Sequence, residues 1–333
     1  MSKGPIIGVN LGGWLVLEKW ITPSLFMGTQ AQDEFTFCQE ANAEQLQRLE
    51  LFRDSFITQA DFEWLASHGV QAVRLPVGYW MFDDAAPFQP TVKYVDRAFE
   101  WAKMTGLKVL LDLHGAPGSQ NGNDHSGRIG PIDWATSPAN ITTTLEVIQK
   151  LAKRYGHHKQ LLGISLLNEP SPQLPKSTLL SYYHQAYVII REACGEDAWV
   201  VYNDGYAPSR WRRELPRSKF QNVYIDMHHY QVFSPLDKRL PPWLNLLRTR
   251  FQLPYAISCH RRYHPVIIGE WSLTLSGIKP EKNSPAKRLR IQRTYGRLQT
   301  KAYQKTAASF FWTYRTESGG GWSFRDCLEK QLL

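Results

Sequence analysis

Short apolar segments alternate with longer segments of helical periodicity along most of the chain. The apolar segments are rich in β-branched residues and cover residues 6–11, 72–77, 108–113, 162–167, 199–203, 223–227, 266–268 and 309–313. Between them, helix-like segments cover residues 59–67, 92–105, 141–155, 178–193 and 288–307. This pattern predicts strands in the first set and helices in the second. Asn140 is expected to cap the helix over 141–155, because its side-chain oxygen can accept from free backbone N–H groups.

Eight strands that alternate with helices predict βα units around a parallel sheet. Such units form either a closed barrel or an open doubly wound sheet. The first predicted strand is not followed by the Gly-rich phosphate turn of many open sheets. We therefore predict an α/β protein with a (β/α)8 TIM barrel, in which residues 1–333 form a single domain.

Three segments between the predicted elements are too long for simple turns, namely residues 22–58, 115–140 and 230–263. In barrels of this type the loops that follow the strands build the active-site face. We therefore expect long βα loops that wall a deep cleft, with ordinary surface insertions as the alternative.

Composition agrees with a globular protein that has one large core, since 43% of the residues are hydrophobic and 21% are charged. The 12 Trp and 15 Tyr residues combine flat apolar faces with polar edges, which suits the binding of sugar rings. A Trp-rich core explains them equally well on composition alone. The net charge of +9 comes from dispersed basic residues without a nucleic-acid motif, so we expect no nucleic-acid partner.

The cysteines and the N-terminal residues indicate the cellular compartment of the protein. The four cysteines are widely separated and lack the spacing of a metal site. The first residues show no basic region followed by an apolar one, and no run approaches the roughly 18 apolar residues of a membrane span. We expect a cytoplasmic protein with reduced thiols and no membrane span, or a secreted one if a signal peptide has been removed.

Two of the predicted strands deliver a carboxylate at their C-terminal ends. Glu169 follows the fourth strand in the sequence LLNEP, and Glu270 follows the seventh in IGEW. Burying a carboxylate there is costly unless the group is paired or used. Opposed across a barrel mouth, the two supply the pair that glycoside hydrolysis needs, one protonating the leaving oxygen and one attacking the anomeric carbon.

Other predicted strand ends contribute polar and aromatic neighbours. Arg74 is expected to hold Glu270 ionised and to lower its pKa through a charge-assisted hydrogen bond. Asn168 can donate to the sugar 2-hydroxyl, and Trp312 offers a floor for the sugar ring. Further polar groups at the strand ends are His114, His228 and Tyr230.

These residues stand in motifs that resemble glycoside hydrolase family 5 of clan A, in particular its exo-β-1,3-glucanase branch. The matching segments are GVNLGGWLVLE at 8–18, ITPSLF at 21–26, VRLP at 73–76, DLHGAPGSQNG at 112–122, LNEP at 167–170, HHYQVF at 228–233, GEW at 269–271 and FWT at 311–313. They cover nearly the whole chain in the expected order.

The resemblance implies hydrolysis of terminal β-glucosides with retention of configuration, with glucan 1,3-β-glucosidase as the first expectation. It makes Glu169 the acid/base and Glu270 the nucleophile. Glu18 and Asp124 match acids that bind the non-reducing-end glucose, which favours exo cleavage. Phe233 matches one half of an aromatic clamp for the next sugar. The substrate is expected to be a β-glucoside or β-glucan oligosaccharide, handled without metal or cofactor, while the oligomeric state stays open.

Two positions depart from the exo-glucanase pattern. Asn123 stands where the other clamp aromatic is usual, and His125 replaces an Asn that helps to bind the terminal sugar. The catalytic residues are thus retained while the leaving-group side differs. A β-diglycosidase, a glycolipid β-glucosidase or a transglycosylase with the same carboxylate pair are the alternatives. A non-catalytic carbohydrate-binding protein is the non-enzymatic alternative, although such a protein has little use for both carboxylates.

Overall fold

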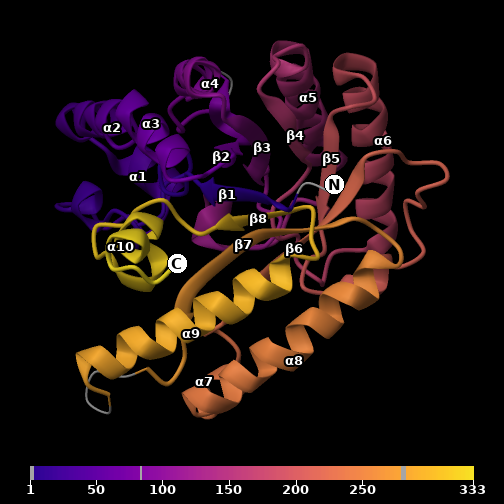
Figure 1. The fold of residues 1–333 in the computed structure, drawn as a ribbon. Helices are drawn as coiled ribbons and strands as arrows, with labels where there is room; N and C mark the ends of the chain where they lie inside the picture. The colour runs from indigo at the N-terminus through magenta and orange to yellow at the C-terminus, as the bar shows by residue number, and fades with distance from the viewer. Residues whose placement is uncertain (1–3, 83–84, 279–282) are drawn as a thin grey trace.

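The computed structural model describes residues 4–82, 85–278 and 283–333. Its centre is a closed barrel of eight parallel strands, hydrogen-bonded in chain order from β1 to β8 and back to β1 (Figure 1). The strands are β1 (Ile6–Asn10), β2 (Ala72–Gly78), β3 (Lys108–Gly115), β4 (Leu161–Ser165), β5 (Trp199–Asn203), β6 (Val223–Gln231), β7 (Val266–Leu275) and β8 (Ala308–Phe311). The (β/α)8 barrel predicted from the sequence is confirmed.

The apolar runs form strands because helices cover the outside of the barrel and side chains fill its interior. A small interior cluster contains Leu110, Val201, Ile267 and Phe310. Alternate residues of the same strands point outward into the larger core beneath the helices. Gly8 allows this filling, because a Cβ there would lie 2.2 Å from the Phe310 ring.

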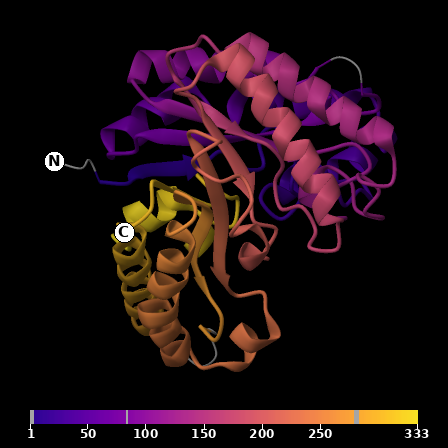
Figure 2. The ribbon, with the colours of Figure 1, turned by 90° about the vertical axis from the view of Figure 1, so that its right-hand side faces the viewer.

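The helices surround the barrel (Figure 2). They are α1 (Glu34–Glu40), α2 (Ala43–Ser55), α3 (Gln59–Ser67), α4 (Val92–Thr105), α5 (Pro138–Tyr155), α6 (Lys176–Cys194), α7 (Pro235–Arg239), α8 (Pro242–Arg261), α9 (Pro285–Tyr303) and α10 (Phe324–Glu329). Short 3-10 segments are η1 (Pro23–Phe26), η2 (Tyr79–Met81), η3 (Asp124–Ser126), η4 (Pro208–Trp211) and η5 (Gly320–Trp322). Across the part of the chain that the structure describes, no helix is both long and apolar enough to span a bilayer.

The capping role expected of Asn140 is wrong. Helix α5 begins at Pro138, with Ser137 at the N-cap, so Asn140 lies inside the first turn. Its side chain donates to the backbone oxygen of Asp133 at 2.9 Å instead. Proline explains the earlier start, since its fixed φ suits the first helical position.

Two further expectations about element bounds are wrong. Strand β7 does not end near Glu270 but continues to Leu275, because β6 and β7 stay paired past two register shifts. Residues 230–263 are not mainly a wall of the cleft, since most of this segment is α8, a helix of the outer ring. Polar side chains on the buried face of α8, Asn245 and Thr249, conceal its helical pattern in the sequence.

Candidate active site

Strand ends and the segments that follow them enclose a cavity of about 870 Å³ at the C-terminal end of the barrel. Its walls carry almost every residue singled out from the sequence. The lining residues are Glu18, Trp20, His114, Asn123, Asp124, His125, Asn168, Glu169, Tyr206, His228, His229, Tyr230, Phe233, Ser234, Asp237, Glu270, Trp312 and Trp322. Of the predicted site residues only Arg74 is not on the wall; it lies fully buried behind Glu270.

Glu169 and Glu270 face one another inside this cavity. Glu169 lies four residues beyond β4, and Glu270 lies within β7. A carboxylate oxygen of each lies within 4.8 Å of the other. This limit on one pair of oxygens agrees with the spacing of about 5–5.5 Å between the carboxyl groups of retaining glycosidases.

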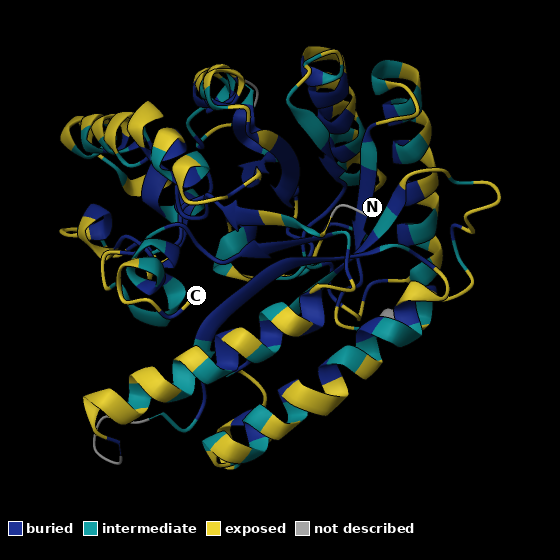
Figure 3. Ribbon diagram, viewed as in Figure 1, coloured by how far each residue is buried: buried dark blue, intermediate teal, exposed yellow. Residues whose placement is uncertain are grey.

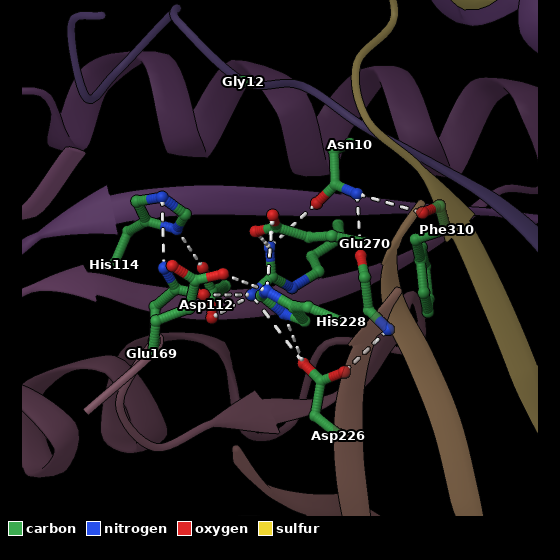
Figure 4. Close-up of polar contacts among 12 residues, drawn as sticks. Asn10, Gly12, Asp112, His114, Glu169, Asp226, His228, Glu270 and Phe310 are labelled. Atoms are coloured by element: carbon green, nitrogen blue, oxygen red, sulfur yellow. Dashed lines mark hydrogen bonds and ion pairs between the residues drawn. The ribbon is translucent and has the colours of Figure 1, made fainter. Parts of the chain in front are cut away.

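Two donors fix the carboxylate of Glu270. The Arg74 guanidinium lies 3.0 Å from Oε1, and the Tyr230 hydroxyl donates to Oε2 at 2.8 Å. Arg74 is itself held by Asp112, 2.9 Å away, and it donates to the Asn168 side-chain oxygen at 2.8 Å. Figure 4 shows Asp112 in the same polar cluster as Glu169, His228 and Glu270. Strands β2, β3 and β6 and the segment after β4 supply these groups and thereby hold Glu270 in one orientation.

A different set of groups surrounds Glu169. The His228 Nδ1 lies 2.5 Å from Oε1, and the His125 Nε2 lies 3.4 Å from Oε2. The Tyr206 hydroxyl also donates to Oε1. The backbone of Glu169 has a φ of 43°, in the left-handed region that non-glycine residues rarely occupy. Such local strain is typical of functional positions, because the surrounding structure must maintain it.

The two carboxyl groups titrate differently. Burial, aided by the charge of Glu169, raises the pKa of Glu270 to about 7 against the opposing charges of His228 and Arg74. Burial also acts to raise the pKa of Glu169, but the hydrogen bond and charge of His228 outweigh it and lower that pKa. Arg74 therefore contacts Glu270 as expected, but the expected net lowering of its pKa is wrong, because burial is the larger effect.

His228 lies between the two carboxylates. Its Nδ1 is 3.3 Å from Glu270 Oε2 as well as 2.5 Å from Glu169 Oε1. Although burial opposes it, the charges of Glu270 and Asp226 raise the pKa of His228 well above its ordinary value. A protonated imidazole therefore bridges the pair.

The floor of the cavity is formed by Trp312 and His114, whose rings stack with centroids 5.4 Å apart. Asp112 holds the His114 Nδ1 at 2.6 Å, while burial lowers the pKa of His114 to about 4. His114 is therefore neutral at pH 7 and leaves Nε2 facing Asn168, 3.3 Å away. An aromatic surface beside fixed polar groups is what a sugar ring with its hydroxyl rim requires.

Gln120 joins the loops that carry this wall. Its fully buried side chain donates to the backbone oxygens of His114 and Asn168, at 2.7 and 2.9 Å. Its oxygen accepts from the backbone N–H of Ala116 at 3.1 Å. The loop after β3 is thus tied to the segment that presents Glu169.

One end of the cavity is acidic. Burial and the charge of Asp124 raise the pKa of Glu18 well above its ordinary value. Glu18 Oε2 accepts from the Trp20 indole at 2.8 Å, while Oε1 is buried without a hydrogen-bond partner among the described residues. An unpaired acceptor beside a second acid can bind the hydroxyls of a terminal sugar.

Of the two positions expected to form an aromatic clamp, one is aromatic. Phe233 is 59% exposed and packs near Trp322, with ring centroids 6.0 Å apart. Asn123, the residue at the position of the second clamp aromatic, also lines the cavity and is exposed.

Three aromatic residues of the cavity wall, Trp20, Tyr206 and Trp322, were not predicted from the sequence. Only Tyr206 carried a usable signal, since it lies three residues past the end of β5, as other site residues do past their strands.

Glu169, His228 and Glu270 are close enough together to offer three ligand atoms to a metal ion. The Arg74 guanidinium and the protonated His228 place positive charge in the same space, which disfavours a cation. Independence from metals and cofactors stays a prediction.

Comparisons with known proteins agree with this geometry. Residues 32–316 match the family described as cellulase (glycosyl hydrolase family 5). The chain is 34% identical to the probable glucan 1,3-beta-glucosidase A of Aspergillus niger, over 98% of this chain and 86% of that protein. It is 33% identical to the glucan 1,3-beta-glucosidase of Schwanniomyces occidentalis, over 98% of this chain and 87% of that protein.

Solved structures share the fold. The rutinosidase from Aspergillus niger superposes with a TM-score of 0.82 at 21% identity, covering 99% of this chain and 97% of that chain. Endo-glycoceramidase II from Rhodococcus sp. superposes with a TM-score of 0.61 at 16% identity, covering 99% of this chain and 79% of that chain.

Proposed function

From the premise that the chain belongs to glycosyl hydrolase family 5, we propose that it is a retaining exo-acting β-glucosidase. Its proposed substrate is a β-1,3-glucan oligosaccharide, from which it releases the terminal glucose. The observation that carries this proposal is the pair of carboxylates, Glu270 buried and Glu169 partly buried, with oxygens within 4.8 Å of one another.

In the proposed mechanism Glu270 attacks the anomeric carbon and forms a glycosyl ester, while Glu169 donates its proton to the departing oxygen. Glu169 then takes a proton from water, whose oxygen attacks the anomeric carbon and releases Glu270. Two displacements at one carbon give net retention. Turnover requires Glu270 ionised and Glu169 protonated, and His228, which contacts both carboxylates, provides a path for that proton.

The remaining site residues bind and orient the sugar. Arg74 holds the side-chain oxygen of Asn168, and one N–H of its amide points to His114 Nε2. The second N–H can donate to the sugar 2-hydroxyl, a contact that strengthens in the transition state. Trp312 supports the apolar face of the ring. Glu18 and Asp124 close the acidic end of the cavity and bind terminal hydroxyls, which supports exo rather than endo cleavage.

The leaving-group side supports a second candidate. Asn123 replaces one aromatic residue of the clamp. His125 stands where the exo-glucanase pattern has an Asn that binds the terminal sugar, and it contacts Glu169. A β-diglycoside or a glucosylated lipid, whose leaving group needs no two-sided clamp, is therefore the alternative substrate. Transfer to a sugar acceptor would use the same carboxylates.

The decisive experiment compares the wild type with Glu270→Gln. We expect the variant to fold, as judged by circular dichroism, and to lose turnover of an aryl β-glucoside, because an amide cannot act as the nucleophile. Glu44→Gln, an exposed change in α2, is the matched control and should retain full activity. Substantial residual hydrolysis by Glu270→Gln would sink the assignment, as would an α-configured first product by NMR.

A substrate panel then separates the two candidates. Laminari-oligosaccharides, gentiobiose, rutinosides and glucosylceramide should be compared by kcat/KM, with transfer products followed at high substrate concentration. We expect laminari-oligosaccharides to be preferred.

The single-domain organisation and the cytoplasmic location stay predictions of the sequence.

A further inference from the structure

Helix α8 exposes a row of large apolar side chains on the outside of the barrel. Trp243, Leu247, Phe251 and Tyr255 recur at four-residue spacing and are 59%, 43%, 63% and 72% exposed. These four residues are called the α8 stripe below. Four-residue steps keep them on one side of the helix, over a length of about 18 Å.

The amphipathic order of α8 is thus partly reversed. Its buried face carries Asn245 and Thr249, which are satisfied by hydrogen bonds to Asp237 and Gln231. In an ordinary surface helix the apolar stripe faces the core and the polar stripe faces water. Single exposed apolar residues need no explanation, but a continuous row of aromatic and aliphatic side chains marks an interaction surface.

The charges on α8 and on the neighbouring helix α9 all have one sign. Neither helix contains Asp or Glu. Their basic residues are Arg248, Arg250, Arg261, Lys287, Arg288, Arg290, Arg293, Arg297 and Lys301. Together they carry as much charge as the net +9 of the whole chain, so the rest of the protein is electrically balanced. Although basic residues are dispersed along the sequence, the excess of positive over negative charge equals the charge of these two helices.

These cations are not neutralised locally. In the described ranges, Arg248 is the one basic residue of the two helices with an acidic partner, Asp237 at 2.6 Å. Arg290, Arg293, Arg297 and Lys301 lie on the exposed side of α9. The two helices pack side by side, and each carries exposed residues along its length (Figure 3).

The α8 stripe and the basic residues of α9 beside it together favour one kind of partner. A second copy of the chain would oppose two strongly positive faces, which like-charge repulsion disfavours. A protein partner would need a shape matched to a convex ridge. A fluid bilayer accommodates such a ridge, and anionic headgroups supply the complementary charge.

We propose that the outer face of α8 and α9 is a docking surface for an anionic lipid bilayer. The α8 stripe lies among the headgroups, where Trp and Tyr prefer the interface, and the basic residues of α9 bind lipid phosphates. This docking does not depend on the proposed hydrolase activity. It would bring the catalytic cavity close to the membrane, because Phe233 and Leu236, both more than half exposed, lie between the cavity and the start of α8.

Vesicle flotation tests the proposal directly. The full chain should float with phosphatidylcholine vesicles that contain phosphatidylglycerol and not with phosphatidylcholine alone. Binding should fall steeply between about 0.1 and 1 M salt, where the screening length drops from about 10 to 3 Å. Equal binding to both vesicle types, or none to the anionic ones, overturns the proposal.

Variants locate the surface. Arg290→Gln, Arg293→Gln and Arg297→Gln combined should lower the partition coefficient roughly a hundredfold, at about fivefold for each lost charge. Lys103→Gln, Lys153→Gln and Lys159→Gln, exposed positions near α4 and α5, form the matched control and should change it less than about threefold. An equal loss in the control would show that net charge alone matters and would overturn the proposed location.

The apolar stripe is tested in the same way. Phe251→Ser with Trp243→Ser should lower the partition coefficient at least tenfold, whereas Leu51→Ser with Met104→Ser, equally exposed elsewhere, should not. Turnover of a soluble aryl glucoside should be unchanged in every variant. A dimer in sedimentation velocity that Phe251→Ser dissociates would assign the stripe to self-association and overturn the proposal.

Discussion

Asp204 gives a quantitative test of the electrostatics beneath the active site. It lies directly after β5, 5% exposed, and accepts a hydrogen bond from the backbone N–H of Tyr206 at 2.8 Å. Burial, reinforced by the charges of Asp226 and Glu169, raises its pKa from 3.8 to about 7. Asp204→Asn keeps the accepting oxygen but cannot ionise.

The sign and size of the effect follow from proton linkage. The folded state binds the proton more tightly than the unfolded state, so this group's stabilisation is full below about pH 4 and is lost as the pH rises through about 7. A rise of about three pKa units corresponds to about 4 kcal/mol at 1.36 kcal/mol per unit. Relative to the wild type, Asp204→Asn should therefore gain up to about 4 kcal/mol of unfolding free energy between pH 4 and pH 8.

Urea unfolding followed by tryptophan fluorescence at the two pH values measures this gain. Contributions from titrating groups that do not interact with Asp204 cancel in the difference between variant and wild type. Asp197→Asn, at an exposed position before β5, should show the same small difference at both pH values. A wild-type to Asp204→Asn difference that does not change with pH would refute the reasoning, as would one that changes in favour of the wild type.

Three further changes probe the catalytic residues. Arg74→Met leaves buried carboxylates without their cation and should lower the unfolding free energy by about 3–5 kcal/mol in thermal or urea melts; an unchanged stability would show that Arg74 is not their main counter-charge. Glu169→Gln should retain cleavage of a 2,4-dinitrophenyl glucoside, whose leaving group needs no acid, but lose that of an alkyl glucoside. Equal loss on both would contradict the acid role. Asn123→Phe should complete the clamp with Phe233 and lower KM for laminari-oligosaccharides roughly 2- to 10-fold; a raised KM would contradict this.

The sequence predicts the barrel well because parallel strands covered on both sides are apolar along their whole length, and β2 is an example. It also brings Glu169 and Glu270 to one end of the barrel, since each follows or lies within such a run. Helix α8 escapes prediction because its buried positions include Asn245 and Thr249, while four of its exposed positions are large and apolar. No periodicity rule recognises a helix that is apolar toward solvent.

Contacts that depend on loop geometry are also beyond the sequence. Tyr206 reaches Glu169 from a turn in which its own φ is 58°, and no spacing rule predicts that meeting. The pKa of Glu270 shows a related limit. A motif places Arg74 beside Glu270, but only the structure shows how completely the site is removed from water.

The buried amide of Gln120 has a consequence for how this protein can change over evolutionary time. Gln120 ties the base of the loop after β3 to the segment of Glu169 through backbone oxygens, so this connection does not depend on the side chain at position 123. His125, farther along the same loop, contacts Glu169 itself and is constrained by that contact. Positions such as Asn123 can therefore drift, exchanging one leaving group for another, without a penalty in reactivity. New specificities would then arise by gradual substitution at the rim, each intermediate remaining a working catalyst.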